Sequence, residues 1–269
     1  MKHQLRQLLV LIFLLIPGFA LADIVVLVHG YHSSGSTWRY NGITTILASH
    51  GWNDAGTYTP LGNMVLYGQP LTETGNHVIT VELPSEAPVE VQADLLSRYL
   101  DDITQYFPQQ KIHLIAHSAG GIVARLALVN NYAQENKYNV AQFITIATPH
   151  LGSPIASMAE KASDTPIGFF APFIGANEIN RAEILYKQLG KEDKNHFLFW
   201  LNRQPHPPMP YTSIIRSDGS IIKGDWLVPA GSQNMAYVPA IGAKARIILT
   251  PGDHNLKYAD AFVIMRLLP

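Results

Sequence analysis

Short runs of large apolar residues are the feature that most constrains how this chain can fold. The run IVVLV at 24–28 contains no polar residue, which is typical of a strand buried on both faces of a sheet. Similar runs predict further strands at 77–83, 111–118, 141–148, 211–217 and 245–250. Helical spacing of apolar residues occurs between or after them, at 84–107, 119–133 and 256–268. Strands alternating with helices predict an α/β fold with a doubly wound, mostly parallel sheet of about six strands.

Residues 151–210 interrupt this alternation, because they contain no convincing strand. They include the apolar stretch IGFFAPFIG at 167–175, a helical pattern around 178–189 and the proline-rich stretch QPHPPMP at 204–210. A connection of this length predicts a helical cap or lid over the carboxyl edge of the sheet. Phe169, Phe170 and Phe173 are candidate substrate-binding residues in an apolar lid or acyl-chain wall, and packing inside a cap helix is the alternative.

The first 22 residues have the composition of a signal peptide. Lys2 and Arg6 precede an apolar run, and Ala20 and Ala22 form an A-x-A site before Asp23. The run is interrupted by Pro17 and is shorter than the ~20 apolar residues of a spanning helix, although an uncleaved anchor is the alternative. We therefore expect an exported protein, periplasmic or secreted, with one domain at 23–269.

The composition excludes several classes of site. The chain has no cysteine, which rules out disulfides, a cysteine nucleophile and thiolate metal ligands. The formal net charge is −1 and no basic cluster occurs, so nucleic acid is not an expected partner. No HExxH or comparable spacing supports a metal site, and we expect neither a metal nor a cofactor.

Ser118 is the candidate nucleophile, in the stretch IHLIAHSAGG at 112–121. A serine between a strand and a helix on a tight turn needs small residues two positions before and after it, and these are Ala116 and Gly120. Serine is also a common helix N-cap, so Ser118 as a simple cap is the alternative. The first glycine of the usual G-x-S-x-G is alanine here, but the steric requirement is met.

The other parts of a serine hydrolase follow in the required chain order of nucleophile, acid and base. The backbone N–H groups of Tyr31, after the first strand, and Ala119 are the candidate oxyanion donors. After the strand at 211–217 comes Asp225, the candidate acid, with Asp218 as the alternative. After the strand at 245–250 comes His254, the candidate base.

Four separated motifs together resemble the α/β-hydrolase fold lipases and esterases, in particular the compact bacterial triacylglycerol lipases and the related GPI inositol-deacylase group. They are HG at 29–30, AHSAG at 116–120, ATPHLGSP at 147–154 and GDWLVPAGSQ at 224–233. The family's D-x-x-V-P-x-x-S segment maps onto Asp225, Val228, Pro229 and Ser232. The resemblance implies a minimal sheet, because a mature chain starting at the first strand leaves no room for the two leading strands of larger relatives.

These features predict a serine carboxylester hydrolase that forms an acyl-enzyme on Ser118. The alternatives are an acyltransferase, thioesterase or amidase with the same residues, or an inactive hydrolase fold that binds lipid. The expected partners are a small-molecule or lipid ester and a transient lipid interface, with the protein acting as a monomer. His117, His29 and His150 are expected to pack or hydrogen-bond near the site rather than to act as the base.

Overall fold

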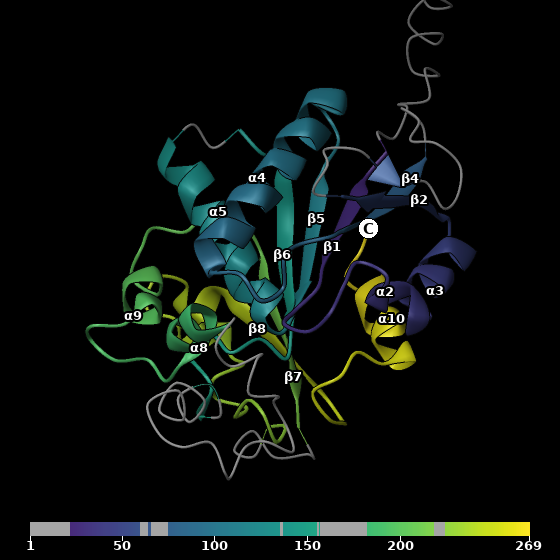
Figure 1. Ribbon diagram of the computed structural model, residues 1–269. Helices are drawn as coiled ribbons and strands as arrows, with labels where there is room; N and C mark the ends of the chain where they lie inside the picture. The colour runs from purple at the N-terminus through teal and green to yellow at the C-terminus, as the bar shows by residue number, and fades with distance from the viewer. Residues whose placement is uncertain are drawn as a thin grey trace, which may run out of the picture.

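The computed structural model describes residues 22–59, 64–65, 75–134, 137–154, 156, 182–217 and 224–269. Its strands form one eight-stranded sheet in the order β3-β2-β4-β1-β5-β6-β7-β8 (Figure 1). All neighbouring strands are parallel except β2 and β3, which are antiparallel. The strands are β1 Ile24–Val28, β2 Trp52–Tyr58, β3 Met64–Val65, β4 Asn76–Val81, β5 Ile112–His117, β6 Val140–Ile146, β7 Tyr211–Arg216 and β8 Ala245–Thr250.

The six expected strands are all present, and β2 and β3 extend the sheet beyond them. In the sequence of β2, WNDAGTY, polar residues and a glycine separate Trp52, Ala55 and Tyr58, so no apolar run predicts a strand. Its polar side chains are satisfied by neighbours. Arg39 donates from Nε to Oδ2 of Asp54 over 2.9 Å, and the hydroxyls of Thr57 and Thr80 lie 2.7 Å apart. β2 and β3 thus occupy the edge next to β4, with segments that follow β1 in the chain.

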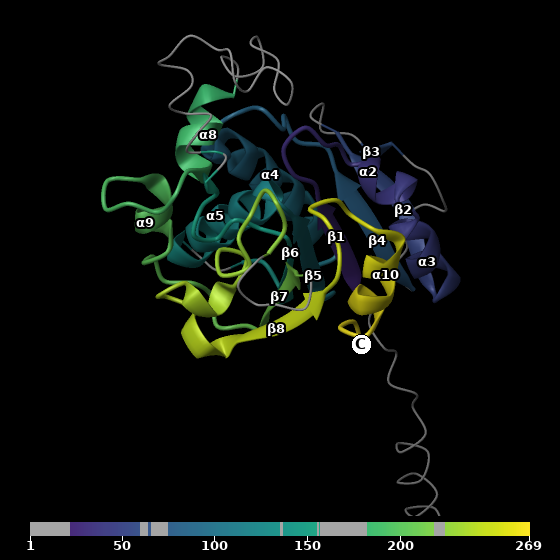
Figure 2. The same ribbon diagram turned by 90° about the horizontal axis from the view of Figure 1, so that it is seen from below.

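Helices cover both faces of the sheet (Figures 1 and 2). On one face lie α4 and α5, which pack against each other, and on the other lie α3 and α10 with α2 beside them. Figure 2 shows α8 and α9 on the opposite side of the molecule from α2, α3 and α10. The helices are α2 Thr37–Tyr40, α3 Ile43–Ser49, α4 Val89–Tyr106, α5 Ala119–Gln134, α8 Glu183–Leu189, α9 Phe197–Leu201 and α10 Tyr258–Met265, with 3-10 turns η1 Met235–Tyr237 and η2 Gly242–Lys244.

The all-apolar sequence of β1 follows from this two-sided burial. Ile24, Val26 and Val28 point into the core under α4 and α5. Val25 and Leu27 alternate with them and point into the core under α3 and α10. Burial of each such side chain stabilises the fold by roughly 1.5–3 kcal/mol, which is why both faces of β1 carry apolar residues.

Several sequence-based expectations fall on residues outside the described ranges. Phe169, Phe170 and Phe173 are among these residues, as is nearly all of the expected signal peptide at 1–22. The described parts of 151–210 contain α8 and α9 and no strand. Within the part of the chain that the structure describes, no helix is both long enough and apolar enough to cross a membrane.

Candidate active site

Ser118 lies on a strained turn between β5 and α5. Its φ is +52°, a left-handed conformation that is rare for residues other than glycine. Its backbone N–H donates to the carbonyl of Ile146 over 2.9 Å, which fixes the turn against β6. A Cβ at Gly120 would collide with the carbonyl oxygen of His29, and one at Gly30 would lie 2.8 Å from Cβ of Ser118. Only small residues therefore allow this turn to form.

His254 bridges Ser118 and Asp225, the three residues that the sequence singled out. His254 follows β8, and its Nε2 lies 2.7 Å from Oγ of Ser118. Its Nδ1 lies 2.9 Å from Oδ2 of Asp225. The side chain of Asp225 is fully buried, whereas Ser118 is only partly buried and lines a pocket. The alternative acid, Asp218, lies outside the described residues.

Asp225 is held by more groups than His254 alone. Its Oδ1 accepts from the backbone N–H groups of Leu227 and Val228, at 2.8 and 2.7 Å. Its Oδ2 accepts from Nε2 of Gln233 at 3.2 Å, while Oε1 of Gln233 accepts from the backbone N–H of Arg216 at 2.7 Å. Gln233 was not predicted as a site residue. It lies inside the motif GDWLVPAGSQ, but the motif alone does not show which of its side chains contacts the acid.

His117 supports the loop that carries His254. Its Nε2 lies 2.8 Å from the backbone carbonyl of His254, so the ring carries its proton on that nitrogen and donates it. The two rings are 5.3 Å apart. Burial, followed by the neighbouring His254, lowers the pKa of His117 to about 3, so the ring is neutral at physiological pH. A neutral ring next to the candidate base does not compete with it for the serine proton.

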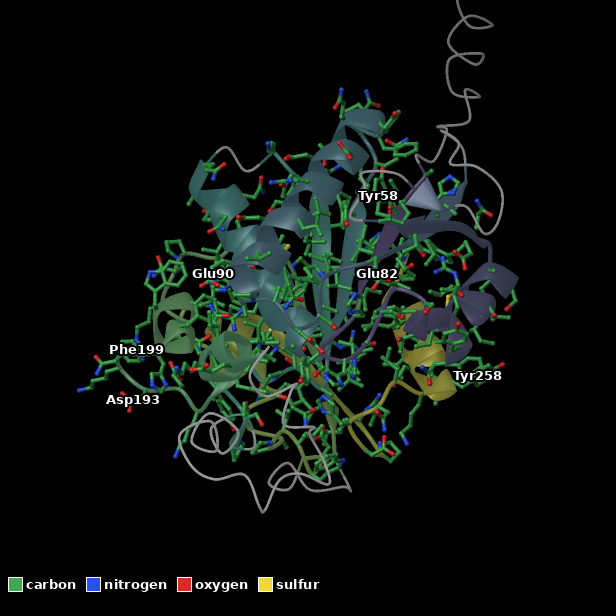
Figure 3. All side chains as sticks on the ribbon, in the orientation of Figure 1. Tyr58, Glu82, Glu90, Asp193, Phe199 and Tyr258 are labelled. Atoms are coloured by element: carbon green, nitrogen blue, oxygen red, sulfur yellow. The ribbon has the colours of Figure 1, made fainter. Side chains whose placement is uncertain are left out.

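His29 holds the loop after β1. The backbone N–H of Leu83 donates to Nε2 of His29 at 3.0 Å, so Nδ1 carries the proton and donates to the carbonyl of Gly30 at 2.9 Å. Burial lowers the pKa of His29, which keeps it in this neutral form. Glu82, which Figure 3 labels, also holds this loop, because its carboxylate accepts from the backbone N–H of Gly35 at 2.8 Å. The loop is thereby tied to the end of β4.

The candidate oxyanion donors flank Ser118. Tyr31 belongs to the loop held by His29, and Ala119 is the first residue of α5, where backbone N–H groups have no partner within the helix. Both residues line the pocket that contains Ser118 and His254. The hydroxyl of Tyr31 lies 2.6 Å from that of Tyr186 in α8, which connects the loop to the segment after β6.

The pocket beside Ser118 has a volume of about 520 Å³, which is within the range of small-molecule sites. Its described lining comes from the loops after β1, β5, β6, β7 and β8, and from α2, α5 and α8. Among the described residues, no group of three or more histidine, aspartate or glutamate side chains is placed to hold a metal ion. Ser118 and His254 line this pocket, and Asp225 lies behind His254.

The fold is that of the α/β hydrolases. A Bacillus licheniformis lipase, BlEst2 in its mature form, superposes with a TM-score of 0.55 and 19% identity over 91% of each chain. The product of gene lin2722 from Listeria innocua superposes with a TM-score of 0.60 and 13% identity over 87% of each chain. At these identities the likeness concerns the fold alone. No curated protein matches the sequence.

Family membership rests on the sequence itself. Residues 21–167, more than half of the chain, match the family described as "Putative serine esterase (DUF676)". This range contains Ser118, the loop with Tyr31 and the ATPHLGSP segment, while Asp225 and His254 lie after it. The expected resemblance to lipases and esterases is confirmed, and the chain belongs to this serine esterase family of hydrolases.

Proposed function

We propose that this hydrolase cleaves carboxylic esters, as a lipase or esterase, with Ser118 as nucleophile, His254 as base and Asp225 as the orienting acid. The observation that carries the proposal is the position of His254, whose two ring nitrogens lie within hydrogen-bond distance of Ser118 and Asp225. Because Asp225 can only accept, Nδ1 of His254 carries the proton and Nε2 is left to accept from the serine hydroxyl.

In the proposed reaction, Nε2 of His254 takes the proton of Ser118 as Oγ attacks the acyl carbonyl carbon. The carbonyl oxygen becomes negatively charged between the backbone N–H groups of Tyr31 and Ala119. His254 then gives its proton to the departing alcohol, which leaves the acyl group on Ser118. A water molecule that loses a proton to His254 attacks this acyl-enzyme, releases the acid and restores Ser118. No cofactor takes part in these steps.

Asp225 stabilises the imidazolium that forms twice in this cycle. Its carboxylate also accepts two backbone N–H bonds and one from Gln233, which hold it in one orientation. The left-handed turn at Ser118 keeps Oγ at the pocket surface, where an acyl group can reach it. Together these contacts favour acyl transfer chemistry over a fold that only binds lipid.

The direct test is hydrolysis of p-nitrophenyl esters with acyl chains of about two to about sixteen carbons. Ser118→Ala should lower kcat by at least about 10³-fold, because the variant lacks the nucleophile. Ser49→Ala is the matched control, since Ser49 is an exposed serine on α3. Equal hydrolysis by wild type and Ser118→Ala would overturn the mechanism. A rate that rises with chain length would favour a lipase over a short-chain esterase.

The acid is tested by a pair of aspartate substitutions. Asp225→Asn should lower kcat about 10³- to 10⁴-fold, because an amide cannot stabilise the imidazolium. Asp253→Asn, at an exposed position one residue before His254, should change kcat less than about threefold. A larger loss in Asp253→Asn than in Asp225→Asn would move the assignment of the acid.

We also propose that the protein is exported with cleavage after Ala22. The support is the sequence pattern of residues 1–22. Amino-terminal sequencing of the protein recovered from the cell envelope or the medium should begin at Asp23. A chain that retains Met1 in the cytoplasm would contradict the proposal.

A further inference from the structure

The strand β8 lies at one end of the sheet, and among the described residues no strand pairs with its outer side. Figure 2 shows β8 along the outer margin of the molecule. All six of its residues pair with β7, without a shift in register. A regular edge strand of this kind presents a row of unpaired backbone N–H and C=O groups, and another strand can pair with them.

The backbone groups of β8 that point away from β7 belong to Ile247 and Leu249. The carbonyl of Thr250 accepts from the backbone N–H of Ser217 at 2.9 Å, so Thr250 bonds toward β7. Alternate residues of a strand direct their backbone groups to the same side, so Ile248 also bonds toward β7. Ile247 and Leu249 therefore direct their N–H and C=O groups outward.

The side chains of these two residues are also exposed. Ile247 and Leu249 each expose 42% of their surface, and they lie on one face of β8 because they are two positions apart. On this edge, η1 packs against β8 and adds the exposed ring of Tyr237. A single exposed aliphatic side chain is ordinary on a protein surface. Here, however, apolar side chains and free backbone groups coincide along one strand.

The two edges of the sheet differ in how they are protected. At the opposite edge, β3 has only two residues, and so short a strand offers little backbone for pairing. In β8 neither a proline nor a bulge interrupts the strand, and Arg246 is its one charged residue. Prolines, bulges and several charges are the usual means by which an edge strand avoids a partner. The β8 edge is therefore the one that can accept another strand.

The pattern of β8 is complementary to itself when two copies pair antiparallel about Ile248. In that register, Ile247 of each copy lies opposite Leu249 of the other. Both residues direct their backbone groups outward, so each of these pairs forms two hydrogen bonds. The two Ile248 residues meet at the two-fold axis as a pair without hydrogen bonds, with their Cα atoms about 4.5 Å apart.

The charges around β8 favour a second copy in this orientation. Lys244 and Arg246 are exposed at the start of the strand, and Asp253 is exposed after its end. Antiparallel pairing brings the basic end of one copy to the end of the other that carries Asp253, which also contacts Lys257 of its own chain at 3.3 Å. The two Arg246 residues are then separated along the strand by four residues, or roughly 14 Å. A register shifted to centre on Ile247 would instead make them diagonal neighbours, about 7–8 Å apart.

We infer that two copies of this chain associate through β8, antiparallel about Ile248, so that one sheet runs through both. The two-fold symmetry uses the free edge of both copies, so the assembly closes at the dimer. The inference does not depend on the proposed function, because none of the pairing residues belongs to the candidate site. It differs from the monomer expected from the sequence, in which ARIILT indicates a strand but not an edge.

Sedimentation velocity of the purified protein tests the association. Between about 1 and about 100 μM, the mass should rise to twice that of the chain. Ile247→Lys should raise the dissociation constant of the dimer by at least about tenfold, because it places two lysines diagonally across the pairing and removes apolar contact. Val91→Lys is the matched control, since Val91 is an exposed branched residue on α4, and its dissociation constant should stay within about twofold of wild type.

The register can be tested by disulfide cross-linking, because the chain has no cysteine of its own. Ile248→Cys should cross-link two copies on mild oxidation, since a Cα separation of about 4.5 Å lies within the range of about 4.4–6.8 Å for disulfides. Ile247→Cys alone and Leu249→Cys alone should not, because like residues lie about 7–8 Å apart. A mixture of these two variants should cross-link, whereas Val91→Cys should not.

The possible outcomes are distinct. A protein that stays monomeric up to about 100 μM, without cross-linking of Ile248→Cys, would overturn the inference. A dimer that Ile247→Lys leaves as tight as Val91→Lys does would show that the interface is not β8. Cross-linking of Ile247→Cys alone would contradict the register. If Ile248→Cys does not fold, the mixture of Ile247→Cys and Leu249→Cys, both at exposed positions, decides the same question.

Discussion

Arg125 and Arg216 are both buried, with 0% and 1% of their surface exposed, but their surroundings differ in charge. Arg216, at the end of β7, donates from Nη1 and Nη2 to the two carboxylate oxygens of Asp260 at 2.7 and 2.6 Å. Arg125, in α5, has neutral partners. It donates to Oδ1 of Asn202 at 2.8 Å, to Nε2 of His206 and to Nδ1 of His150.

The cluster of Arg125 depends on two neutral histidines. Arginine can only donate, so His150 and His206 must each present a bare nitrogen to it. Their protons then lie on the other nitrogens, which donate to Oγ1 of Thr145 and to the carbonyl of Gln204. Burial lowers the pKa of Arg125 to about 9, which still leaves it charged at neutral pH. Among the described residues, no carboxylate forms an ion pair with it.

The cluster of Arg216 is connected to the candidate site. Its guanidinium also donates to the carbonyl of Asn255 at 3.0 Å, next to His254, and to Oγ1 of Thr250 at 2.8 Å. Its backbone N–H donates to Gln233, which in turn contacts Asp225. Arg216 thus neutralises Asp260 and holds the loops of the site. Arg125, in contrast, is a cation whose N–H groups donate to the lone pairs of two imidazole rings.

The largest expected effect is on stability at neutral pH. Arg216→Met leaves the buried carboxylate of Asp260 without its cation and should lower the free energy of unfolding by about 3–5 kcal/mol. Arg125→Met removes hydrogen bonds but also a buried, unneutralised charge, so its cost should be below about 2 kcal/mol. Urea unfolding of both variants measures the difference. Equal losses would show that charge neutralisation does not distinguish the clusters.

A second expected effect is on the pH dependence of stability. Burial, and after it the charge of Arg125, lowers the pKa of His150 and that of His206, the latter from 6.5 to about 3. Between pH 6.5 and about pH 3, the unfolded chain therefore binds a proton at His206 that the folded protein does not bind. The contribution of His206 to the free energy of unfolding is complete above pH 6.5 and is lost as the pH falls toward 3. The loss is at most ~1.4 kcal/mol per pH unit for one histidine.

Buried His29 and His117 change stability in the same direction, so the variants are needed to isolate the cluster. Unfolding free energies measured from about pH 7.5 to about pH 3 should fall less steeply at the acid end in Arg125→Met than in wild type, because the cation that opposes protonation of the folded histidines is gone. Arg98→Met, at an exposed position on α4, should keep the wild-type slope over this range. Parallel curves for Arg125→Met and wild type would rule out the coupling.

The smallest expected effect is on catalysis. Gln233→Met removes the amide that joins Arg216 to Asp225 and should lower kcat about tenfold, with little change in KM, because it loosens the acid rather than the pocket. Asn202→Leu, the equivalent loss of a neutral partner in the other cluster, should leave kcat within about twofold. The assay uses p-nitrophenyl esters at a temperature where both variants are folded. A larger kcat loss in Asn202→Leu would reverse the comparison.

Local signals explain why much of the architecture was predictable. Strands in the middle of a sheet are rich in apolar residues, and all six of the predicted runs form strands. The turn at Ser118 needs small residues beside it, so AHSAG identifies it without knowledge of the neighbours. The chain order of Asp225 and His254 after β7 and β8 indicated residues that the structure brings to Ser118.

The features that were not predicted depend on contacts between distant segments. β2 is recognisable only through its pairing with β4, because polar residues and a glycine separate its apolar residues. Gln233 stands in a motif with other polar residues, and only the folded loop brings its amide to Asp225. Arg125 occurs in an apolar helix pattern, and nothing near it in the chain shows that His150 and His206 surround it.

The sequence by itself determined the α/β layers, the strained serine turn and the order of the candidate catalytic residues, because each depends on residue types at short spacing. The tertiary structure decided the partners of the buried polar groups: which arginine meets a carboxylate, and which nitrogen of each histidine carries its proton. The physical reason is that a buried polar group must find a partner wherever the fold places one, and that partner can lie far away in the chain.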